Sequence, residues 1–239
     1  MTRRARHFVG LASAAIAAML LAGPARADSK PLNLADFLGL DLSSGIKAVV
    51  TPGEAFSVTA QSSRAGDIQD LKASVEGGVL HASYDWSIWH IFDFSGRDMT
   101  LLVTMPELDS IALSGGSSLS VNSVPSDDLK IDVSGGAGVK MLAASAKRYT
   151  VNASGGATIV VSGTCYNASI NASGGATVNL RDVVCADVTV AVSGGAHLSA
   201  SATASAAGSV SGGADVSISG HPALAQIDAS GGGKIDYPN

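Results

Sequence analysis

The sequence is poor in aromatic residues, charged residues and cysteine. Aromatic residues make up 5% of the 239 positions, charged residues make up 15%, and there are two cysteines. A zinc site needs about four ligands at short spacing, and no histidine or third cysteine completes such a set around Cys165 and Cys185. We therefore expect no metal site. Small residues are abundant, but 46% of the chain is hydrophobic, which argues against disorder and favours one folded domain.

The chain also lacks a long hydrophobic run. The longest, residues 9–22, is short of the roughly 20 residues that a membrane-spanning helix needs. It follows Arg3, Arg4 and Arg6 and precedes Ala-Arg-Ala at 25–27, which is the pattern of a secretory signal peptide. We predict a signal peptide at residues 1–27, no membrane-spanning segment and, because no cysteine lies near the cleavage site, no lipid anchor.

Positive charge is scarce once this segment is removed. Residues 1–27 hold four arginines and no acidic residue, so cleavage lowers the formal charge from −5 to −9. An acidic protein of this kind is not expected to bind nucleic acid or an anionic membrane surface. We expect an exported protein in the periplasm, at the cell surface or outside the cell.

What the sequence does have is a repeat. Ser-Gly-Gly begins at residues 114, 134, 154, 173, 193, 211 and 230. Such a regular period indicates a repeat architecture, and paired glycines supply backbone angles that other residues resist. We predict a chain corner at each copy, formed by Gly115, Gly116, Gly135, Gly136, Gly155, Gly156, Gly174, Gly175, Gly194, Gly195, Gly212, Gly213, Gly231 and Gly232.

Apolar residues alternate with small or polar ones on both sides of each corner, which is the signature of a strand. Three apolar columns stand three residues before, one before and five after each serine, exemplified by Ile131, Val133 and Val139. We predict an all-β fold, a single-stranded, parallel, right-handed β-helix with 19–20 residues per coil. Val, Ile and Leu would fill the inside, and Ser, Asn and Thr would form outward ladders. Asn-Ala-Ser triplets at Asn152, Asn167 and Asn171 match the glycosylation pattern, but two of them recur at the corner and are explained more simply by such ladders.

The two cysteines occupy one column of successive coils. Cys165 and Cys185 each stand eight residues before a repeat serine, so neighbouring coils would bring their Cα atoms to about 4.8 Å, within disulfide range. Export favours an oxidising compartment. We predict a coil-to-coil disulfide, with two stacked thiols as the alternative.

The segment before the repeats keeps strand alternation without the tripeptide. We predict a cap or linker at 28–44, which includes a short helix or loop over the end of the solenoid. The β-helix would then cover 45–239, with irregular first coils at 45–105 and Ser-Gly-Gly coils at 106–239.

One segment concentrates the scarce aromatic residues: Tyr84, Trp86, Trp89, Phe92 and Phe94. Two interpretations are open. The segment is a hydrophobic flap packed against the solenoid, or it is an exposed aromatic platform for a glycan, a partner protein or self-association.

Sequence patterns for catalysis and cofactors are missing. No Ser-Gly-Gly copy carries the Gly-Lys-Ser/Thr of a phosphate loop, the aspartate column of calcium-binding solenoids is absent, and there is no Gly-x-Ser-x-Gly. His197 reads as a solvated surface residue, and His81 and His221 have no evident partners. We expect no cofactor and no enzyme activity.

The order "GEAFSVTAQ", "DLKASVEGGVLHASY", "LLVTMPELDSIALSGGSSLSV" and then repeated "SGGA" resembles the bacterial GIN domain, also called the auto-transporter adhesin head domain. The resemblance covers roughly residues 45–237 and implies a secreted or envelope-associated parallel β-helix without assigned catalytic residues.

These observations lead to one functional hypothesis and two alternatives. The first is a non-enzymatic secreted or envelope protein for adhesion or surface scaffolding, with a glycan or a cell-surface protein as partner. The alternatives are a carbohydrate-active enzyme on a β-helix, similar to a polysaccharide lyase, and a purely structural envelope element that self-associates. The oligomeric state is left open.

Overall fold

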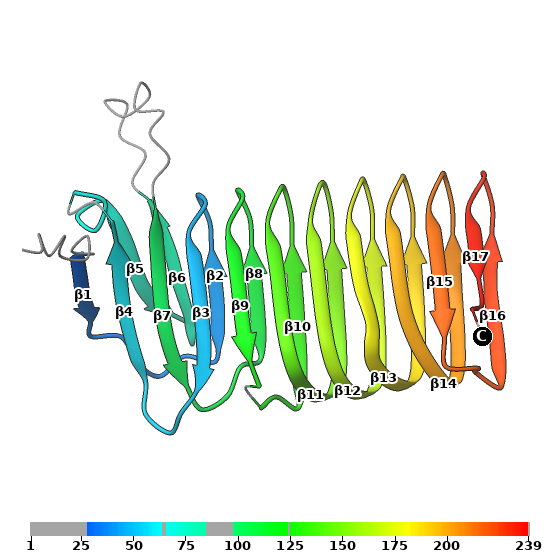
Figure 1. Ribbon diagram of the computed structural model, residues 1–239, viewed down its shortest axis with the longest axis horizontal. Helices are drawn as coiled ribbons and strands as arrows, with labels where there is room; N and C mark the ends of the chain where they lie inside the picture. Colours follow the sequence, from blue (N-terminus) through cyan, green and yellow to red (C-terminus); the bar gives the residue numbers. More distant parts are fainter. Residues whose placement is uncertain (1–27, 64–65, 85–97, 124, 239) are drawn as a thin grey trace, which may run out of the picture.

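The computed structural model describes residues 28–63, 66–84, 98–123 and 125–238, which form β-strands and no helix. The strands build a β-solenoid of about six turns, elongated along the coil axis (Figure 1). The sequence prediction of a β-solenoid is confirmed, while the hand of the coil stays a prediction. No described helix is long and apolar enough to cross a membrane.

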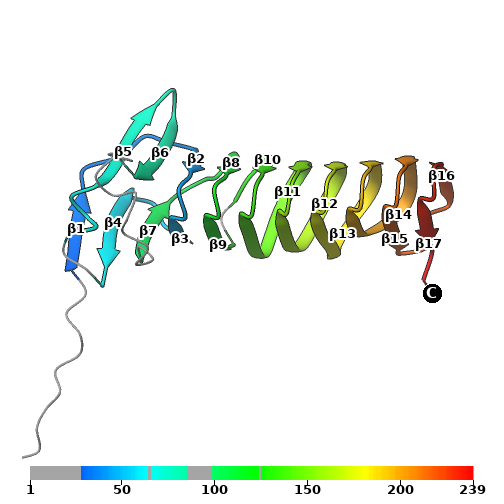
Figure 2. The same ribbon diagram turned by 90° about the horizontal axis from the view of Figure 1, so that it is seen from above.

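The strands lie in two stacks that face each other across the core (Figure 2). The first stack contains β5 (Leu71–Glu76), β6 (Val79–Tyr84), β2 (Gly39–Leu42), β8 (Ser110–Leu113), β10 (Asp128–Val133), the later halves of β11 (Gly138–Ala153), β12 (Thr158–Ala172), β13 (Thr177–Val192) and β14 (His197–Val210), and β16 (Leu224–Ala229). The second contains β1 (Asp28–Leu32), β4 (Ser57–Ser62), β7 (Met99–Met105), β3 (Lys47–Pro52), β9 (Ser118–Asn122), the earlier halves of β11 to β14, β15 (Asp215–Ser219) and β17 (Lys234–Asp236).

Each regular coil runs up one stack, turns sharply, runs down the other stack and returns along a broad curve. The Ser-Gly-Gly corners lie at the upper edge in Figure 1 and the returns at the lower edge. The predicted apolar columns face inward: Ile131, Val133 and Val139 are 0–3% exposed. The residue after each Ser-Gly-Gly, mostly alanine, is almost fully buried from Ser117 to Ala214, because the two stacks converge there.

The corner glycines divide into two groups. The first glycine of each copy has φ between 58° and 71°, a region that disfavours a side chain, so the predicted requirement holds there. The second glycine has a positive φ only at Gly116 and Gly232. The other five second glycines are not required to be glycine, because their φ is not positive and the nearest atom to an added Cβ is 3.4 Å away or more.

The order of the first coils in space differs from their order in sequence. β2 pairs with β6 on one side and β8 on the other, and β3 pairs likewise with β7 and β9. The β2–β3 coil therefore lies between coils that follow it in the chain (Figure 1). No feature of the sequence indicated this order, and β2–β3 has the geometry of a regular coil although it lacks the Ser-Gly-Gly tripeptide.

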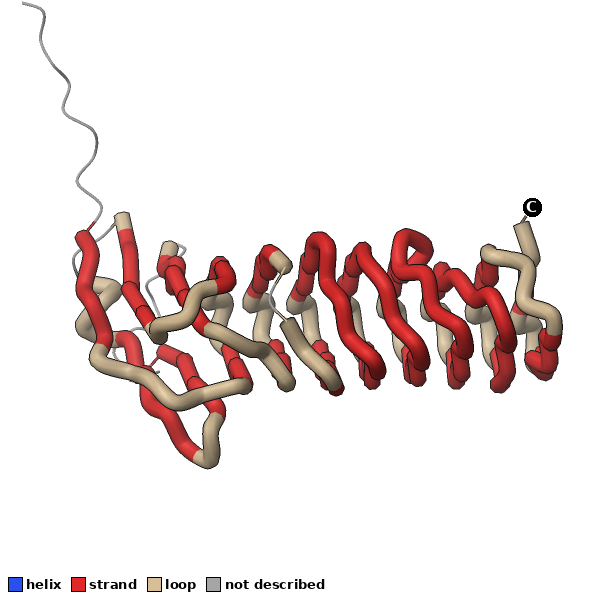
Figure 3. The backbone as a smooth tube through the Cα atoms, turned by 90° about the horizontal axis from the view of Figure 1, so that it is seen from below, coloured by secondary structure: helices blue, strands red, loops and turns tan. Residues whose placement is uncertain are grey.

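The start of the described chain forms β1 and β2 joined by a loop, so of the predicted short helix or loop over this end the helix alternative is wrong. β1 pairs antiparallel with β4, β4 pairs antiparallel with β7, and β5 pairs antiparallel with β6. These antiparallel strands stand at the left of the tube in Figure 3 and extend the parallel stacks at their first coils. The predicted division into a signal peptide at residues 1–27, a cap or linker at 28–44 and a β-helix at 45–239 stays a prediction.

The largest fully buried side chain of the core is Tyr149, in β11. Its hydroxyl finds no hydrogen-bond partner among the described residues, and an unsatisfied buried hydroxyl costs about 1–3 kcal/mol. We expect Tyr149→Phe to raise the free energy of unfolding by about 1 kcal/mol in urea denaturation at pH 7. Tyr237→Phe, which changes an exposed ring, is the control. A loss of stability in Tyr149→Phe would contradict the prediction.

The same substitution should change the response to alkaline pH. Burial raises the pKa of Tyr149 to about 12, whereas an unfolded tyrosine has a pKa near 10. Below pH 10 both states keep the proton, and between pH 10 and 12 the unfolded chain ionises first, so stability falls as the pH rises through this window. We expect Tyr149→Phe to lose less stability than the unmodified protein between pH 10 and 12.

Candidate functional site

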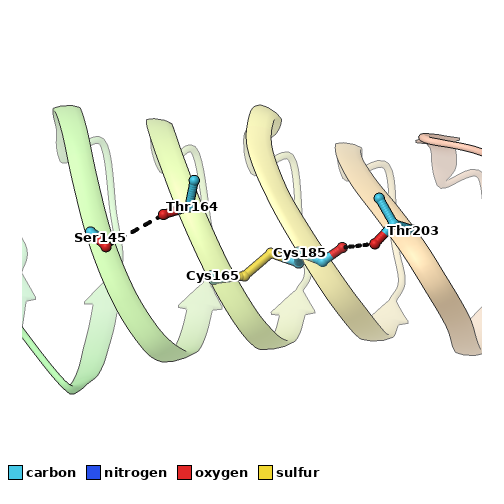
Figure 4. The surroundings of a disulfide bond; sticks show 5 residues. All are labelled: Ser145, Thr164, Cys165, Cys185 and Thr203. Carbon is cyan, nitrogen blue, oxygen red and sulfur yellow. Dashed lines mark hydrogen bonds between the residues drawn. A yellow bond between two sulfur atoms is a disulfide. The ribbon is translucent and has the colours of Figure 1, made fainter.

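The predicted disulfide is present. Cys165 and Cys185 are bonded on the return segments of successive coils, with Cα atoms 4.6 Å apart. Figure 4 shows the bond beside the Ser145–Thr164 hydrogen bond, which lies in the adjacent column of the returns. The alternative of two free thiols is thereby excluded, since the described residues contain no free cysteine.

The predicted aromatic platform is only partly visible. Tyr84 is 4% exposed in β6 and belongs to the core, so its ring is not on an exposed face. Trp86, Trp89, Phe92 and Phe94 lie outside the described residues. For these four the platform stays a prediction.

The outward ladder is the most regular polar feature of the first stack. It is one column of residues paired across nine strands: His81, Asp41, Ala112, Asp132, Asn152, Asn171, Ala191, Ser209 and Asp228. The amide of Asn171 donates to Asn152 Oδ1 at 2.9 Å, and the amide of Asn152 donates to Asp132 Oδ1 at 2.6 Å. The predicted asparagine ladder is confirmed.

The middle of this ladder lines a groove of about 480 Å³ that extends across several coils. We call it the ladder groove. Its other wall is the column of corner serines, Ser114, Ser134, Ser154, Ser173 and Ser193. Each asparagine of the ladder uses one amide hydrogen along the coil axis, so its second N–H and the corner hydroxyls are available to a ligand.

The ladder is interrupted at Ala112. On one side Asp132 accepts hydrogen bonds with both oxygens, one from Asn152 and one from Lys130, whose Nζ lies 2.8 Å away. On the other side Asp41 Oδ2 lies 3.0 Å from His81 Nδ1. Two coil spacings, about 10 Å, separate the two aspartates. Ala112 thus leaves a gap between two half-exposed carboxylates, which we call the ladder gap.

A second hollow of about 510 Å³ lies on the return side of the solenoid. We call it the return cleft. Its walls come from the turn after β7, the loop between β9 and β10, and the returns in β11 and β12, and they include Glu107, Asp127, Lys147 and Tyr166. Lys147 Nζ donates to Asp127 Oδ2 at 2.9 Å. This hydrogen bond raises the pKa of Lys147.

The histidines of the described residues make two pairs with carboxylates. His81 contacts Asp41, which corrects the expectation that His81 has no partner; the neighbour comes from a strand 40 residues earlier. His197 Nδ1 lies 3.3 Å from Asp215 Oδ2, and its side chain is 60% exposed. No described group of three or more His, Cys, Asp or Glu side chains could hold a metal ion.

Sequence reasoning found the ladder but neither hollow. The column alignment already contained Ala112 and Asp132, but Asp41 and His81 could be placed only after the out-of-order pairing of β2 was known. The return cleft is built from loops that differ in length from coil to coil. The alignment of the repeats on their Ser-Gly-Gly corners therefore could not have indicated it.

The chain matches the family model described as "Putative auto-transporter adhesin, head GIN domain" over residues 36–222. No curated protein matches significantly. Among solved structures, a "putative adhesin" from Bacteroides fragilis is similar with a TM-score of 0.80 and 17% identity, over 89% of this chain and 97% of that one. A "putative adhesin" from Parabacteroides merdae has a TM-score of 0.65 and 14% identity, over 91% and 98%.

A third similar structure, a "Putative lipid binding protein" from Parabacteroides distasonis, has a TM-score of 0.63 and 16% identity, over 89% of this chain and 97% of that one. At these identities the solved structures establish a shared fold. The family match covers well over half of the sequence and includes both the ladder groove and the return cleft. The chain belongs to the GIN domain family that this model describes.

Proposed function

We propose that this protein is an exported, non-enzymatic adhesin of the cell envelope that holds a glycan in the ladder groove. The observation that carries the proposal is the ladder gap, where a hydrogen-bonded row of side chains stops at Ala112 between two carboxylates and resumes at Asp41. The family membership supports an adhesion role. The predicted signal peptide supports a periplasmic, cell-surface or extracellular location.

The charge balance at the gap favours a sugar over a cation. Asp132 is paired with the ammonium of Lys130, and Asp41 Oδ2 lies within hydrogen-bond distance of His81 Nδ1, so each carboxylate already has one polar partner. Both keep the capacity to accept from hydroxyl groups, since each oxygen of a carboxylate has two acceptor directions. A sugar lying over the small Ala112 side chain would donate to both aspartates and continue the row of hydrogen bonds.

The shape of the groove favours a chain rather than a single sugar. Equivalent side chains recur at each coil, about 4.8 Å apart, so a polymer with a similar repeat can make the same contact several times. Repeated weak contacts raise the overall affinity without any single strong one. This is the behaviour expected of an adhesin that binds a surface polysaccharide.

A carbohydrate-active enzyme on this fold is the second candidate. Two carboxylates about 10 Å apart approach the 6.5–9.5 Å separation of inverting glycosidases. However, one of them must act as a proton donor, and here Asp132 accepts hydrogen bonds with both oxygens while Asp41 is paired with His81. We therefore favour binding without cleavage. Release of reducing ends from a bound polysaccharide would support the enzyme instead.

The proposal is tested by closing the gap. In Ala112→Asn the new amide lies in register between Asp41 and Asp132 and can bond to either. We expect this variant to remain folded and to lose at least about tenfold in affinity on a glycan array, because a binding contact worth about 1.4 kcal/mol corresponds to a factor of ten.

The matched control is Ser209→Asn, which places the same amide in the same column but outside the lining of the ladder groove, and should leave binding nearly unchanged. Thr158→Ala with Thr177→Ala changes exposed residues of the other stack and should also have no effect. A wild-type protein that binds no glycan, or an Ala112→Asn variant that binds as well as wild type, would overturn the proposal. Trp86→Ala with Trp89→Ala tests the aromatic platform separately.

A further inference from the structure

The return cleft differs chemically from the ladder groove. It contains an exposed aromatic ring, that of Tyr166, which is 66% exposed. Large aromatic rings are normally buried, and an exposed ring beside a hollow is a common feature of binding surfaces. Pro125, Ala143, Ala146 and Cys165 add apolar surface around the ring.

The carboxylates of the cleft are not all neutralised. Asp127 is paired with Lys147, and the neighbouring Asp128 is paired with Arg148 at 2.9 Å. Glu107 is half-buried and makes no hydrogen bond or ion pair with any described residue. A partly desolvated carboxylate without a partner is unfavourable, and it leaves the cleft with a net negative charge that a ligand can neutralise.

The backbone around the cleft is unusual as well. Ser123 and Ala143, which both line it, have φ values of 48° and 51°. Residues other than glycine rarely occupy this region, and such outliers occur preferentially at functional sites. The Ser123 N–H donates to the carbonyl of Leu142 at 3.0 Å, so the two segments are joined at the cleft.

We propose that the return cleft binds a basic side chain, lysine or arginine, of a partner polypeptide. The Glu107 carboxylate supplies the opposite charge, and the Tyr166 ring offers its face to the cation, an interaction that contributes about 0.5–1 kcal/mol at exposed sites, a factor of about two to five. The hydroxyls of Ser145 and Thr164, which bond to each other at 3.4 Å, are available to the peptide backbone.

The cleft uses none of the residues of the ladder groove. The two sites can therefore be tested separately, and failure of one leaves the other standing. Ala112→Asn should weaken glycan binding and leave binding in the return cleft unchanged.

The test is a titration of the protein with acetyl-Gly-Lys-Gly-amide, followed by NMR chemical shifts of the backbone amides. The uncharged control peptide carries norleucine, which keeps the four-carbon chain and removes the ammonium group. We expect saturable shifts at residues 107, 145 and 164–166 with the lysine peptide, at least about tenfold weaker binding of the norleucine peptide, and weaker lysine binding at 0.5 M salt because exposed charges are screened.

Two variants with matched controls complete the test. Glu107→Gln should weaken the lysine peptide about five- to tenfold and Tyr166→Ala about two- to fivefold. Glu76→Gln and Tyr237→Ala make the same chemical changes at exposed positions elsewhere and should have no effect. Equal binding of both peptides, no binding of either, or unchanged affinity in Glu107→Gln would overturn the proposal.

Discussion

Gly163→Ala is expected to lower the free energy of unfolding by about 4 kcal/mol or more. Gly163 lies in β12 with φ of 142°, a conformation that is rarely accessible to residues with a Cβ. An added Cβ would overlap the carbonyl oxygen of Ala144 in the preceding coil. That oxygen belongs to the backbone of a packed return segment, so it cannot move away without disturbing the pairing of two coils.

The measurement is urea denaturation of Gly163→Ala beside Gly138→Ala. Gly138 lies in β11 at a φ that is not positive, and the nearest atom to an added Cβ there is 3.7 Å away. Gly138→Ala should change stability by less than about 1 kcal/mol, and a small gain is expected because alanine restricts the unfolded chain. A loss in Gly163→Ala as small as the change in Gly138→Ala would contradict the prediction, because it would show that a local shift relieves the clash at Gly163.

The coil architecture could be predicted from the sequence because one period governs most of the chain. A strand has period two, so a column three residues before a corner and one directly before it must face the same way. Ile131 and Val133 follow this rule, and both are buried. The disulfide followed from the same alignment, because a column position in successive coils fixes the distance between two residues.

The coil formed by β2 and β3 was missed although its signal is present. Its corner is Ser43-Ser44-Gly45 rather than Ser-Gly-Gly, with Ser44 at φ 63° and Gly45 at φ 78°. Leu40, Leu42, Ile46 and Ala48 stand three before, one before, three after and five after Ser43 and are buried. An alignment on the apolar columns instead of the glycines would have found it.

The position of that coil within the stack could not have been predicted in this way. A parallel strand is satisfied by any neighbour with a matching pattern of apolar residues, so the column pattern does not determine which coil lies beside which. The ladder gap depends on this order, because Asp41 enters the column only when β2 pairs with β8. The candidate site was therefore less predictable than the fold that carries it.

The second large effect is expected from the loss of the disulfide. The bond joins residues 20 positions apart, and closure of a loop of this size restricts the unfolded chain by about 3 kcal/mol in the chain-entropy model. Cys165→Ser with Cys185→Ala should therefore lower the free energy of unfolding by about 3 kcal/mol in urea denaturation. Alanine suits position 185 because Cys185 is 2% exposed.

Reduction of the unmodified protein is the matched control for this double variant. Dithiothreitol should lower the stability of the wild type to nearly that of the variant and leave the variant unchanged. A loss of less than about 1 kcal/mol in both experiments would mean that the unfolded chain keeps these two coils close together without the bond.

Hydrogen exchange should show where the stability is lost. Each coil of a solenoid contacts mainly its neighbours, so stability is approximately a sum of coil terms and interface terms. The disulfide crosses the single interface between the returns of β12 and β13. When it is removed, β13 to β17 can separate from the preceding coils at this interface. We expect amide exchange to accelerate more in β13 and β14 than in β8 to β10, whereas equal acceleration along the chain would indicate that the solenoid unfolds as one cooperative unit.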